Sequence, residues 1–494
     1  MAMASCLEGL EPKRVLEIFS DLCQIPHGSK NEKAISDYIY NFAKNLNLEC
    51  YQDQANNLII KKPASPGYEN APTVILQAHM DMVCEKNADV VHDFKKDPIH
   101  ILRDGDRIHA DGTTLGADDA TGVAFAMCVL EDESIVHPNL EVILTTDEEA
   151  GMSGIQALDF SKIQGRVIIN LDCSDEGIVV GCAGSAVVRF DLKEERETVN
   201  ADEETVKLRV QGLKGGHSGL DITKERGNAN VLLTRILAAA EDMAGTKLVT
   251  ITGGLQNNAI CREAEAAVTI AKDKKAELQD LVQEWQKILK KEFKISDPDV
   301  KVVLDEAEKA ETRFTAEGSA KIIDFMMSLD SGVIAMNMEV PGVAETSGNV
   351  GTIVTDNDTV TVRVCYRSGL NSKKEYTIEK SKRLARMAHA GFAVESSSSE
   401  WEYKSDSRLS ALIQRIYLKR YGQPIKVEVS HGGNECGTFF KHFPDADIVC
   451  TGTQIIGPHT PNESVMVSII QKEWEMLQLE LKGCLLYTSP SPRD

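Results

Sequence analysis

The sequence predicts two domains: an α/β domain with a mostly parallel, mixed sheet between helices, and an α+β domain inserted into it. Three observations indicate this arrangement. The chain has 494 residues, which is long for a single hydrophobic core. Strand-like and helical segments alternate up to residue 171, and alternating half-buried strands follow from about residue 185. A serine run near residue 396 ends this second region, and a helical segment follows it. We therefore expect one domain from 1–186 and 397–483, and the other from 187–396.

The first domain is expected to begin with two helices within residues 12–50, joined by a loop in which Ser29 or Asn31 caps the second helix. The expected strands are 57–61, 73–76, 141–145 and 166–171, and the segment 117–131 is helical in period. Ligand sites of such sheets lie beyond the carboxyl ends of the strands.

The inserted domain is expected to contain several alternating strands and three helices. The strands are 186–192, 204–210, 266–271, 300–304 and 356–366, and the helices are 228–244, 275–293 and 377–390. The serine run 396–400 is expected to be a linker or turn, and helices at 408–421 and 467–482 follow it. The tail 484–494 resembles translated non-native sequence and is excluded from the fold.

Composition excludes several classes of function. The formal charge of −22 argues against binding to nucleic acid or to an anionic membrane, both of which require basic patches. No apolar run approaches the roughly 18 residues of a membrane span, and the N-terminus has no signal-peptide pattern. The twelve cysteines are scattered without framework spacing, which is typical of reduced thiols in a cytoplasmic protein.

Adjacent carboxylates at Glu148 and Glu149 follow the apolar run 142–144. Side chains of neighbouring residues point in different directions, so one could bind a metal while the other handles a proton. Such pairs are also common on solvated surfaces. Their meaning therefore depends on whether other ligands occur at the ends of the other strands.

Two further candidates follow the strand 73–76 and open the helix 117–131. His79 and Asp81 share a face of an extended chain, so Asp81 could hold the His79 imidazole in the tautomer that a metal requires. Asp119 is expected to cap the helix. Asp118 would then be free to bind, and its two oxygens could bridge two cations. An ordinary polar loop is the competing interpretation for each segment.

The remaining candidates are Asp172, directly after the strand 166–171, and His459, in a rigid Gly-Pro-His-Thr-Pro loop. The candidate ligands contain no cysteine, so they suit zinc, manganese or cobalt in a mixed His/carboxylate site rather than a structural Cys-type zinc site. They are His79, Asp118, Glu149, Asp172 and His459. Two metal ions that share a carboxylate can activate water and stabilise a tetrahedral intermediate. Glu148 would serve as the general base.

Several motifs in a fixed order then point to a family. They are Gln77-Ala78-His79-Met80-Asp81-Met82-Val83, Gly112-Thr113-Thr114-Leu115-Gly116-Ala117-Asp118-Asp119, Thr146-Asp147-Glu148-Glu149-Ala150-Gly151-Met152, Gly215-Gly216-His217-Ser218-Gly219 and Ile456-Gly457-Pro458-His459. The chain resembles the cocatalytic zinc metallopeptidases of the aminoacylase/carboxypeptidase type, and within them the Xaa-His dipeptidase group. The likeness runs from about residue 10 to residue 483.

The resemblance implies roles for single residues. One zinc ion would take His79 and Asp172, the other would take Glu149 and His459, and Asp118 would bridge them. Manganese or cobalt could replace zinc. Glu148 would be the base and Glu149 the ligand, and it is the resemblance that assigns the two roles in this order. Asp81 would orient His79.

The inserted domain would be a lid that holds substrate. His217 would donate to the developing oxyanion, and Asn258 and Arg262 would hold the substrate, Arg262 being well suited to a C-terminal carboxylate. Arg367 is a second carboxylate partner, and His431 and Glu435 are pocket residues. The competing interpretation for these residues is a structural polar role.

The resemblance predicts a metal-dependent dipeptidase for unblocked dipeptides of broad sequence, including Xaa-His dipeptides. The expected binding partner is then a small peptide substrate, and the sequence does not decide whether the protein forms a homodimer. The alternatives are a tripeptidase, an N-acyl amino acid hydrolase or a carboxypeptidase of the same fold. A metal-binding or scaffolding protein without catalysis would require a missing ligand or base, and none is missing.

Overall fold

The computed structural model describes residues 4–173 and 177–484, and it divides into two compact units. The first unit consists of Met1–Gly181, Tyr403–Val429 and Asn434–Asp494, and the second of Cys182–Glu402 and Ser430–Gly433. The unit borders at 181/182 and 402/403 lie close to the predicted borders at 186/187 and 396/397. The short segment Ser430–Gly433 was not predicted to belong to the second unit. The predicted non-native tail, except Cys484, lies outside the described residues.

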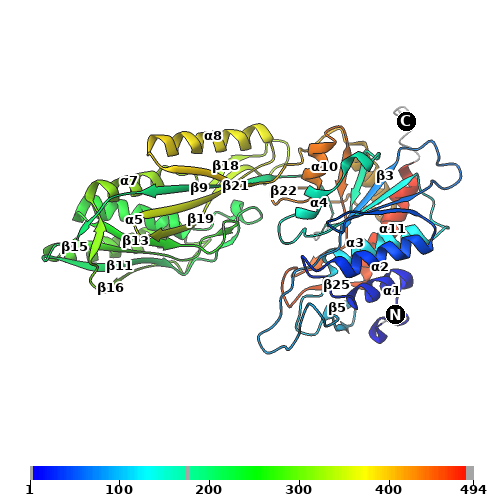
Figure 1. Ribbon diagram of the computed structural model, residues 1–494, viewed down its shortest axis with the longest axis horizontal. Coiled ribbons are helices and arrows are strands. Elements are labelled where there is room, and N and C mark those ends of the chain that lie inside the picture. The colour runs from blue at the N-terminus through cyan, green and yellow to red at the C-terminus, as the bar shows by residue number, and fades with distance from the viewer. Residues whose placement is uncertain (1–3, 174–176, 485–494) are drawn as a thin grey trace. The chain divides into compact units, whose positions relative to one another are not determined.

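An eight-stranded mixed sheet forms the centre of the first unit, in the order β1-β2-β6-β3-β7-β23-β8-β22 (Figure 1). Its strands are β1 (Glu49–Gln52), β2 (Leu58–Lys62), β3 (Val74–His79), β6 (Leu140–Thr145), β7 (Val167–Asn170), β8 (Ile178–Cys182), β22 (Val427–Ser430) and β23 (Asp447–Cys450). The prediction of a mixed sheet is confirmed. Strands β6, β3, β7 and β23 pair in parallel, and β1, β2 and β8 add antiparallel pairs on either side of them.

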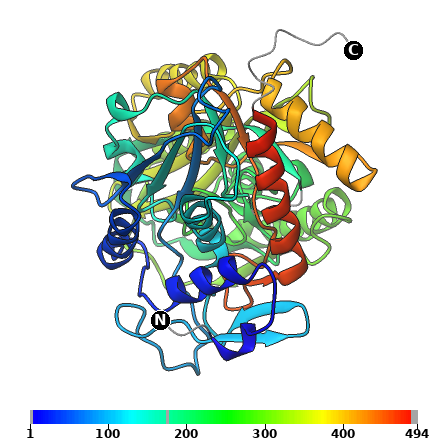
Figure 2. The same cartoon turned by 90° about the vertical axis from the view of Figure 1, so that its right-hand side faces the viewer.

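Helices with apolar faces cover this sheet. They include α1 (Lys13–Cys23), α2 (Lys33–Asn45), α3 (Ala117–Glu131), α9 (Arg408–Tyr421) and α11 (Val467–Gly483). Helix α3 is buried on almost every side, and its Phe125 stacks on Trp474 of α11, the helix drawn in red in Figure 2, with ring centroids 5.6 Å apart. The helix 117–131 was predicted with these bounds because its sequence is apolar throughout and its start is marked by a turn of small residues.

A smaller sheet in the first unit carries the loop of His459. Its order is β24-β25-β5-β4, and the strands are β4 (Ile101–Asp104), β5 (Arg107–Ala110), β24 (Ile455–Ile456) and β25 (Ser464–Met466). These short strands were not predicted. They form two local hairpins, β4 with β5 and β24 with β25. The hairpins are joined by the pairing of β25 with β5, between residues more than 300 positions apart, such as Met466 and Arg107, and no local pattern predicts that pairing.

The second unit is an α+β structure built on a nine-stranded sheet in which every recorded pair is antiparallel. Its strands are β9 (Gly184–Lys193), β11 (Glu203–Gln211), β13 (Lys247–Gly253), β15 (Ala264–Ala271), β16 (Lys301–Glu306), β18 (Gly332–Met336), β19 (Ala344–Asp356), β20 (Thr359–Ser368) and β21 (Gly391–Ser397). Along β9, Val188, Phe190 and Leu192 are buried in the core, as the alternation predicted.

Helices α5 (Ala229–Ala244), α6 (Lys275–Glu292), α7 (Ala316–Met327) and α8 (Asn371–Met387) share this core (Figure 1). The longest strand, β19, was missed because its polar residues 345–349 hide the strand pattern, although all of them are buried. The prediction of a turn at 396–400 is partly wrong, because Ser396 and Ser397 pair with β9 as the end of β21.

No disulfide joins the cysteines of the described residues. No helix within 4–173 and 177–484 is both long and apolar enough to cross a membrane.

Candidate active site

His79 ends strand β3 and is 1% exposed. Its Nδ1 lies 3.0 Å from the backbone oxygen of Asp81, so it donates there and leaves Nε2 as the free ligand atom. Nε2 is 3.2 Å from Oδ1 of Asp118 and 3.9 Å from Oδ1 of Asp172. Burial alone would lower the pKa of His79, but the hydrogen bonds to Asp118 and Asp81 and the charge of Asp172 raise it well above its usual value.

The Asp81 carboxylate does more than the predicted orientation of His79. Its Oδ1 is 3.5 Å from Nδ1 of His79. Instead, the carboxylate accepts the backbone N–H groups of Glu148 at 3.0 Å and of Glu149 at 3.2 Å. Burial opposes the charged form, yet these bonds and His79 hold the pKa of Asp81 at about 2. Asp81 therefore fixes the backbone of the adjacent carboxylates, and the closest contact of Nδ1 is with its carbonyl.

The turn that carries Glu148 and Glu149 follows β6 and begins with a left-handed residue, Asp147, at φ 56°. Glu32 accepts the backbone N–H of Asp147 at 3.0 Å. The Asp147 carboxylate is bonded by Ser153. Both the backbone and the side chain of Asp147 therefore have hydrogen-bond partners. These bonds hold Asp147 in a conformation that few non-glycine residues adopt.

Asp118 lies at the start of α3, where its Oδ1 meets His79 and its Oδ2 is 3.6 Å from Nε2 of His459. The neighbouring Asp119 accepts the backbone N–H of Gly122 at 3.2 Å, which is the predicted helix cap. Asp118 is thereby left with both oxygens turned to histidines from distant parts of the chain.

His459 stands in the loop between β24 and β25, and is the most exposed of the predicted ligands at 52% for its side chain. Its Nε2 is 2.9 Å from Oε1 of Glu149. Hydrogen bonds to Asp118 and Glu149 raise the pKa of His459 to about 10.

The predicted ligands therefore come together in three groups whose ligand atoms lie within 4.8 Å of one another. The groups are His79, Asp118 and Asp172; Asp118, Glu149 and His459; and His79, Glu148 and Glu149. Burial and the charge of Asp118 raise the pKa of Asp172 well above its usual value. Carboxylates that repel one another this strongly fit a site for cations, and the mixed His/carboxylate set fits zinc, manganese or cobalt.

Glu148 belongs only to the third group. Its pKa lies well above its usual value, mainly because of burial. The charge of His79 lowers this pKa, but the negative charges of Glu435, Glu149 and Asp118 raise it. A carboxylate with a raised pKa takes up a proton more readily than an ordinary one.

Glu435, predicted as a pocket residue, lies buried at the ends of the same strands. It accepts hydrogen bonds from Nε2 of Gln77 at 2.5 Å and from Oγ1 of Thr145 at 2.6 Å. Burial raises its pKa to about 7. It supports the end of the sheet and joins none of the three ligand groups.

The second unit brings together three of the other predicted residues: His217, Arg367 and His431. The guanidinium of Arg367 donates to Oγ of Ser218 at 3.3 Å and lies 3.4 Å from Nε2 of His217. Burial and the charges of Arg367 and His217 lower the pKa of His431 to about 3, so its ring is neutral. The cluster is positive, buried and polar.

Two backbone N–H groups face one ring nitrogen of His217. Gly219 and Leu220 donate to its Nδ1 at 3.3 and 3.2 Å. The other ring nitrogen, Nε2, faces the guanidinium of Arg367.

Asn258 and Arg262 do not join this cluster through their side chains. Asn258 is exposed and accepts the backbone N–H of Ser218 through its carbonyl at 2.8 Å. Arg262 is exposed, and its Nε donates to the backbone oxygen of Leu213 at 3.3 Å.

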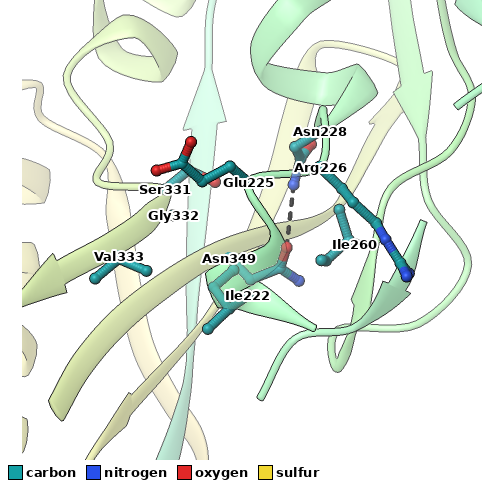
Figure 3. Close-up of a pocket in the computed structure, with 9 residues that line it drawn as sticks. All are labelled: Ile222, Glu225, Arg226, Asn228, Ile260, Ser331, Gly332, Val333 and Asn349. Atoms are coloured by element: carbon teal, nitrogen blue, oxygen red, sulfur yellow. Dashed lines mark hydrogen bonds between the residues drawn. The ribbon is translucent and has the colours of Figure 1, made fainter. Parts of the chain in front are cut away.

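His217 stands on a short two-stranded ribbon of β12 (Gly216–His217) and β14 (Ala259–Ile260). Ile260 pairs with Gly216 and Ala259 with His217, so the Ile260 and His217 side chains lie on opposite faces. A cavity of about 230 Å³ on the Ile260 face is lined by Asn349, which accepts a hydrogen bond from Asn228 at 3.1 Å (Figure 3). Asn349 also donates to the backbone oxygens of Asn257 and Ala259, and so anchors the ribbon on the face opposite to His217.

Comparison with known proteins agrees with this geometry. Residues 75–479 match the model of Peptidase family M20/M25/M40. The chain belongs to this family. The resemblance that the motifs indicated is confirmed, and with it the assignment to the peptide-bond hydrolases.

Relatives of the chain in this peptidase family include the cytosol non-specific dipeptidase of Escherichia coli, which is 39% identical over 96% of this chain and 98% of the relative. The crystal structure of an aminoacylhistidine dipeptidase from Vibrio alginolyticus matches with a TM-score of 0.88 at 36% identity, over 96% of this chain and 97% of that one. A tripeptidase from Staphylococcus aureus shares the fold at 15% identity, with a TM-score of 0.56 over 96% of this chain and 99% of that one.

Sequence reasoning missed three residues that hold the site in place: Ser29, Glu32 and Glu463. Ser29 was expected to cap α2, but that helix has no side-chain cap, and Oγ of Ser29 donates to Oδ2 of Asp81 at 2.7 Å. The other cap candidate, Asn31, instead donates to the backbone oxygen of Pro26. Glu463, four residues after His459, bonds the backbone around Asp118.

We predict that binding of divalent cations to the metal-free protein releases protons. His79 and His459 have raised pKa values, so both rings carry protons at neutral pH and must lose them to become ligands. Calorimetric titration with Co²⁺ in buffers of different ionisation enthalpy should give a release of at least two protons, since the pKa of the ligand Asp172 is also raised, and a lower affinity as pH falls. His459→Asn should release about one proton fewer. A heat that is independent of the buffer would contradict the prediction.

Proposed function

We propose that this protein is a cytoplasmic, metal-dependent dipeptidase that hydrolyses unblocked dipeptides of broad sequence, including Xaa-His dipeptides. The observation that carries the proposal is the pair of ligand groups that share Asp118, in a chain 39% identical to a cytosol non-specific dipeptidase over nearly the whole of that relative. The likeness to an aminoacylhistidine dipeptidase supports the inclusion of Xaa-His substrates.

Two metal ions per chain, zinc with manganese or cobalt as alternatives, would be held by these groups. His79 and Asp172 would hold one ion, Glu149 and His459 the other, and Asp118 both. Bound there, the ions would polarise the scissile carbonyl and make an attacking water more acidic.

Glu148 is proposed to move the proton. It takes a proton from the water that attacks the carbonyl carbon, and it returns that proton to the nitrogen as the C–N bond breaks. Its raised pKa makes Glu148 a stronger proton acceptor than an ordinary carboxylate, which suits the first half of this transfer. Asp81 keeps the backbone of Glu148 and Glu149 fixed, so the base and the ligand retain their separate directions.

The second unit is proposed to be a lid that binds the substrate. Arg367 is only 6% exposed and has no carboxylate partner among residues 4–173 and 177–484, so a substrate carboxylate would supply its missing counter-charge. This favours Arg367 over the exposed Arg262 for the C-terminal carboxylate. His217, whose Nδ1 accepts the backbone N–H groups of Gly219 and Leu220, would donate to the developing oxyanion, while Asn258 and His431 would line the pocket.

The proposed activity predicts a preference among substrates. The purified protein loaded with zinc, manganese or cobalt should hydrolyse free dipeptides, with much slower turnover of N-acetylated dipeptides and of tripeptides. Release of free amino acids, followed by chromatography, measures this. Faster hydrolysis of the N-acetylated substrates would point to an acyl amino acid hydrolase, and faster hydrolysis of tripeptides to a tripeptidase.

The adjacent carboxylates predict two different losses. Glu149→Ala should lower the metal content, because it removes a ligand that faces His459 at 2.9 Å. Glu148→Ala should keep the metal bound and lower kcat by roughly 10²–10⁴-fold, the usual contribution of a general base. Metal analysis after dialysis, with kcat on one dipeptide, distinguishes them. Equal loss of metal in both variants would contradict the division of roles.

Arg367 predicts a loss of carboxylate recognition. Arg367→Met should lower kcat/KM for a dipeptide by about 10²-fold, as expected when one partner of a buried ion pair is removed. It should change hydrolysis of the matching dipeptide amide far less, since the amide lacks the carboxylate. Arg262→Met is the control and should keep the preference for the free carboxylate. If Arg262→Met abolishes that preference and Arg367→Met does not, the assignment is reversed.

A further inference from the structure

Glu463 is a buried carboxylate, 2% exposed, that belongs to none of the three ligand groups. Both of its oxygens face backbone N–H groups at the start of α3. Oε2 accepts from Leu115 at 2.8 Å and Gly116 at 3.1 Å, and Oε1 accepts from Ala117 at 2.8 Å and Asp118 at 3.3 Å. One of the four donors is thus the backbone N–H of Asp118, the residue proposed to bind both ions.

These four N–H groups converge because the backbone turns sharply before the helix. Gly116 adopts a left-handed conformation at φ 74°, and successive N–H groups around such a residue point to one side and form an anion-binding concavity. A side chain at residue 116 would also collide with Sδ of Met82. The concavity is filled by a side chain of this chain, which fixes the backbone on which Asp118 stands.

Glu463 also anchors the loop of His459. It lies directly before β25, at the base of the hairpin in which Ile456 pairs with Ser464, and its own N–H donates to the backbone oxygen of Thr460 at 3.0 Å. His459 has a half-exposed side chain and a left-handed backbone at φ 61°, so little packing restrains it. Through Glu463 the loop is bonded to the same backbone that carries Asp118, about 345 positions earlier in the chain.

We infer that Glu463 is a positioning residue that holds Asp118 and His459 in register. The ion shared by Asp118, Glu149 and His459 therefore depends on Glu463 more than the other ion does. His79 and Asp172 follow the buried strands β3 and β7, which pair with each other, so their positions do not depend on the hairpin. The inference rests on the proposed two-metal site.

The test is a stepwise metal titration of Glu463→Gln. Glutamine keeps the size of the side chain, but its amide NH₂ would face backbone N–H donors, so about half of the four hydrogen bonds are lost. Metal-free protein is titrated with Co²⁺ and followed by calorimetry and visible absorption, without any peptide. The wild-type protein should bind two ions. The variant should bind both ions less tightly, because both use Asp118, but the second, which also uses His459, should lose more, about 10–100-fold, the usual effect of losing a support behind a ligand.

Glu141→Gln is the matched control. Glu141 is also 2% exposed in the first unit and accepts the backbone N–H groups of Gln164 and Gly165, but it lies at the opposite end of β6 from Glu148. Both ions should bind Glu141→Gln as in the wild type. If Glu463→Gln does not fold, Glu463→Asp keeps the charge on a shorter side chain and should again weaken the second ion more than the first, to a smaller extent.

Three results would overturn the inference. They are unchanged binding of the second ion to both Glu463 variants, equal weakening of both ions, and the same loss in Glu141→Gln. Binding of fewer than two ions by the wild-type protein would instead contradict the two-metal proposal itself. The two failures are thus distinguishable, because they appear in different proteins of the same titration.

Discussion

Mutual repulsion of half-buried carboxylates is the constraint on which the rest of the first unit depends. Strand ends and loops bring Asp118, Glu148, Glu149 and Asp172 around His79, and burial with neighbouring charge raises the pKa of Asp172 and of Glu148. Such a cluster is costly unless each charge finds a partner. Histidines and, in the proposed enzyme, cations neutralise the oxygens that face inward, while backbone N–H groups neutralise the carboxylates behind them.

That second set of carboxylates explains how an irregular site is held rigid. Asp81 binds the backbone of Glu148 and Glu149, Glu32 binds that of Asp147, and Glu463 binds the turn before α3. Each takes up N–H groups that the turns leave without a partner, and an unpaired buried N–H group costs about 1–3 kcal/mol. The ligand loops are therefore ordered by the chain itself. Metal would bind to a site that is already arranged, which lowers the entropic cost of binding.

The sequence allowed the ligands at strand ends to be predicted, but not the residues that support them. His79, Glu149 and Asp172 follow apolar segments whose ends are visible in the sequence, and a parallel sheet brings such ends together. His459 was included because of its rigid Gly-Pro-His-Thr-Pro loop, whereas the pairing of its hairpin with the distant strand β5 was not foreseen. Ser29 and Glu463 could not be recognised, since a side chain that bonds the backbone of a distant turn has no local pattern. Arg262 was preferred to Arg367 for the same reason: burial without a counter-charge is a property of the fold.

The adjacency of Glu148 and Glu149 acquires its meaning from the turn that carries them. Both backbone N–H groups bond one carboxylate, Asp81, so the two residues cannot rotate independently. Glu149 then reaches His459 at 2.9 Å and belongs to two of the ligand groups, whereas Glu148 belongs only to the group with His79 and Glu149. The left-handed Asp147 precedes both residues. Two chemically identical side chains therefore differ only in the position that the backbone gives them, and in the proposed mechanism this difference would let one bind metal while the other carries a proton.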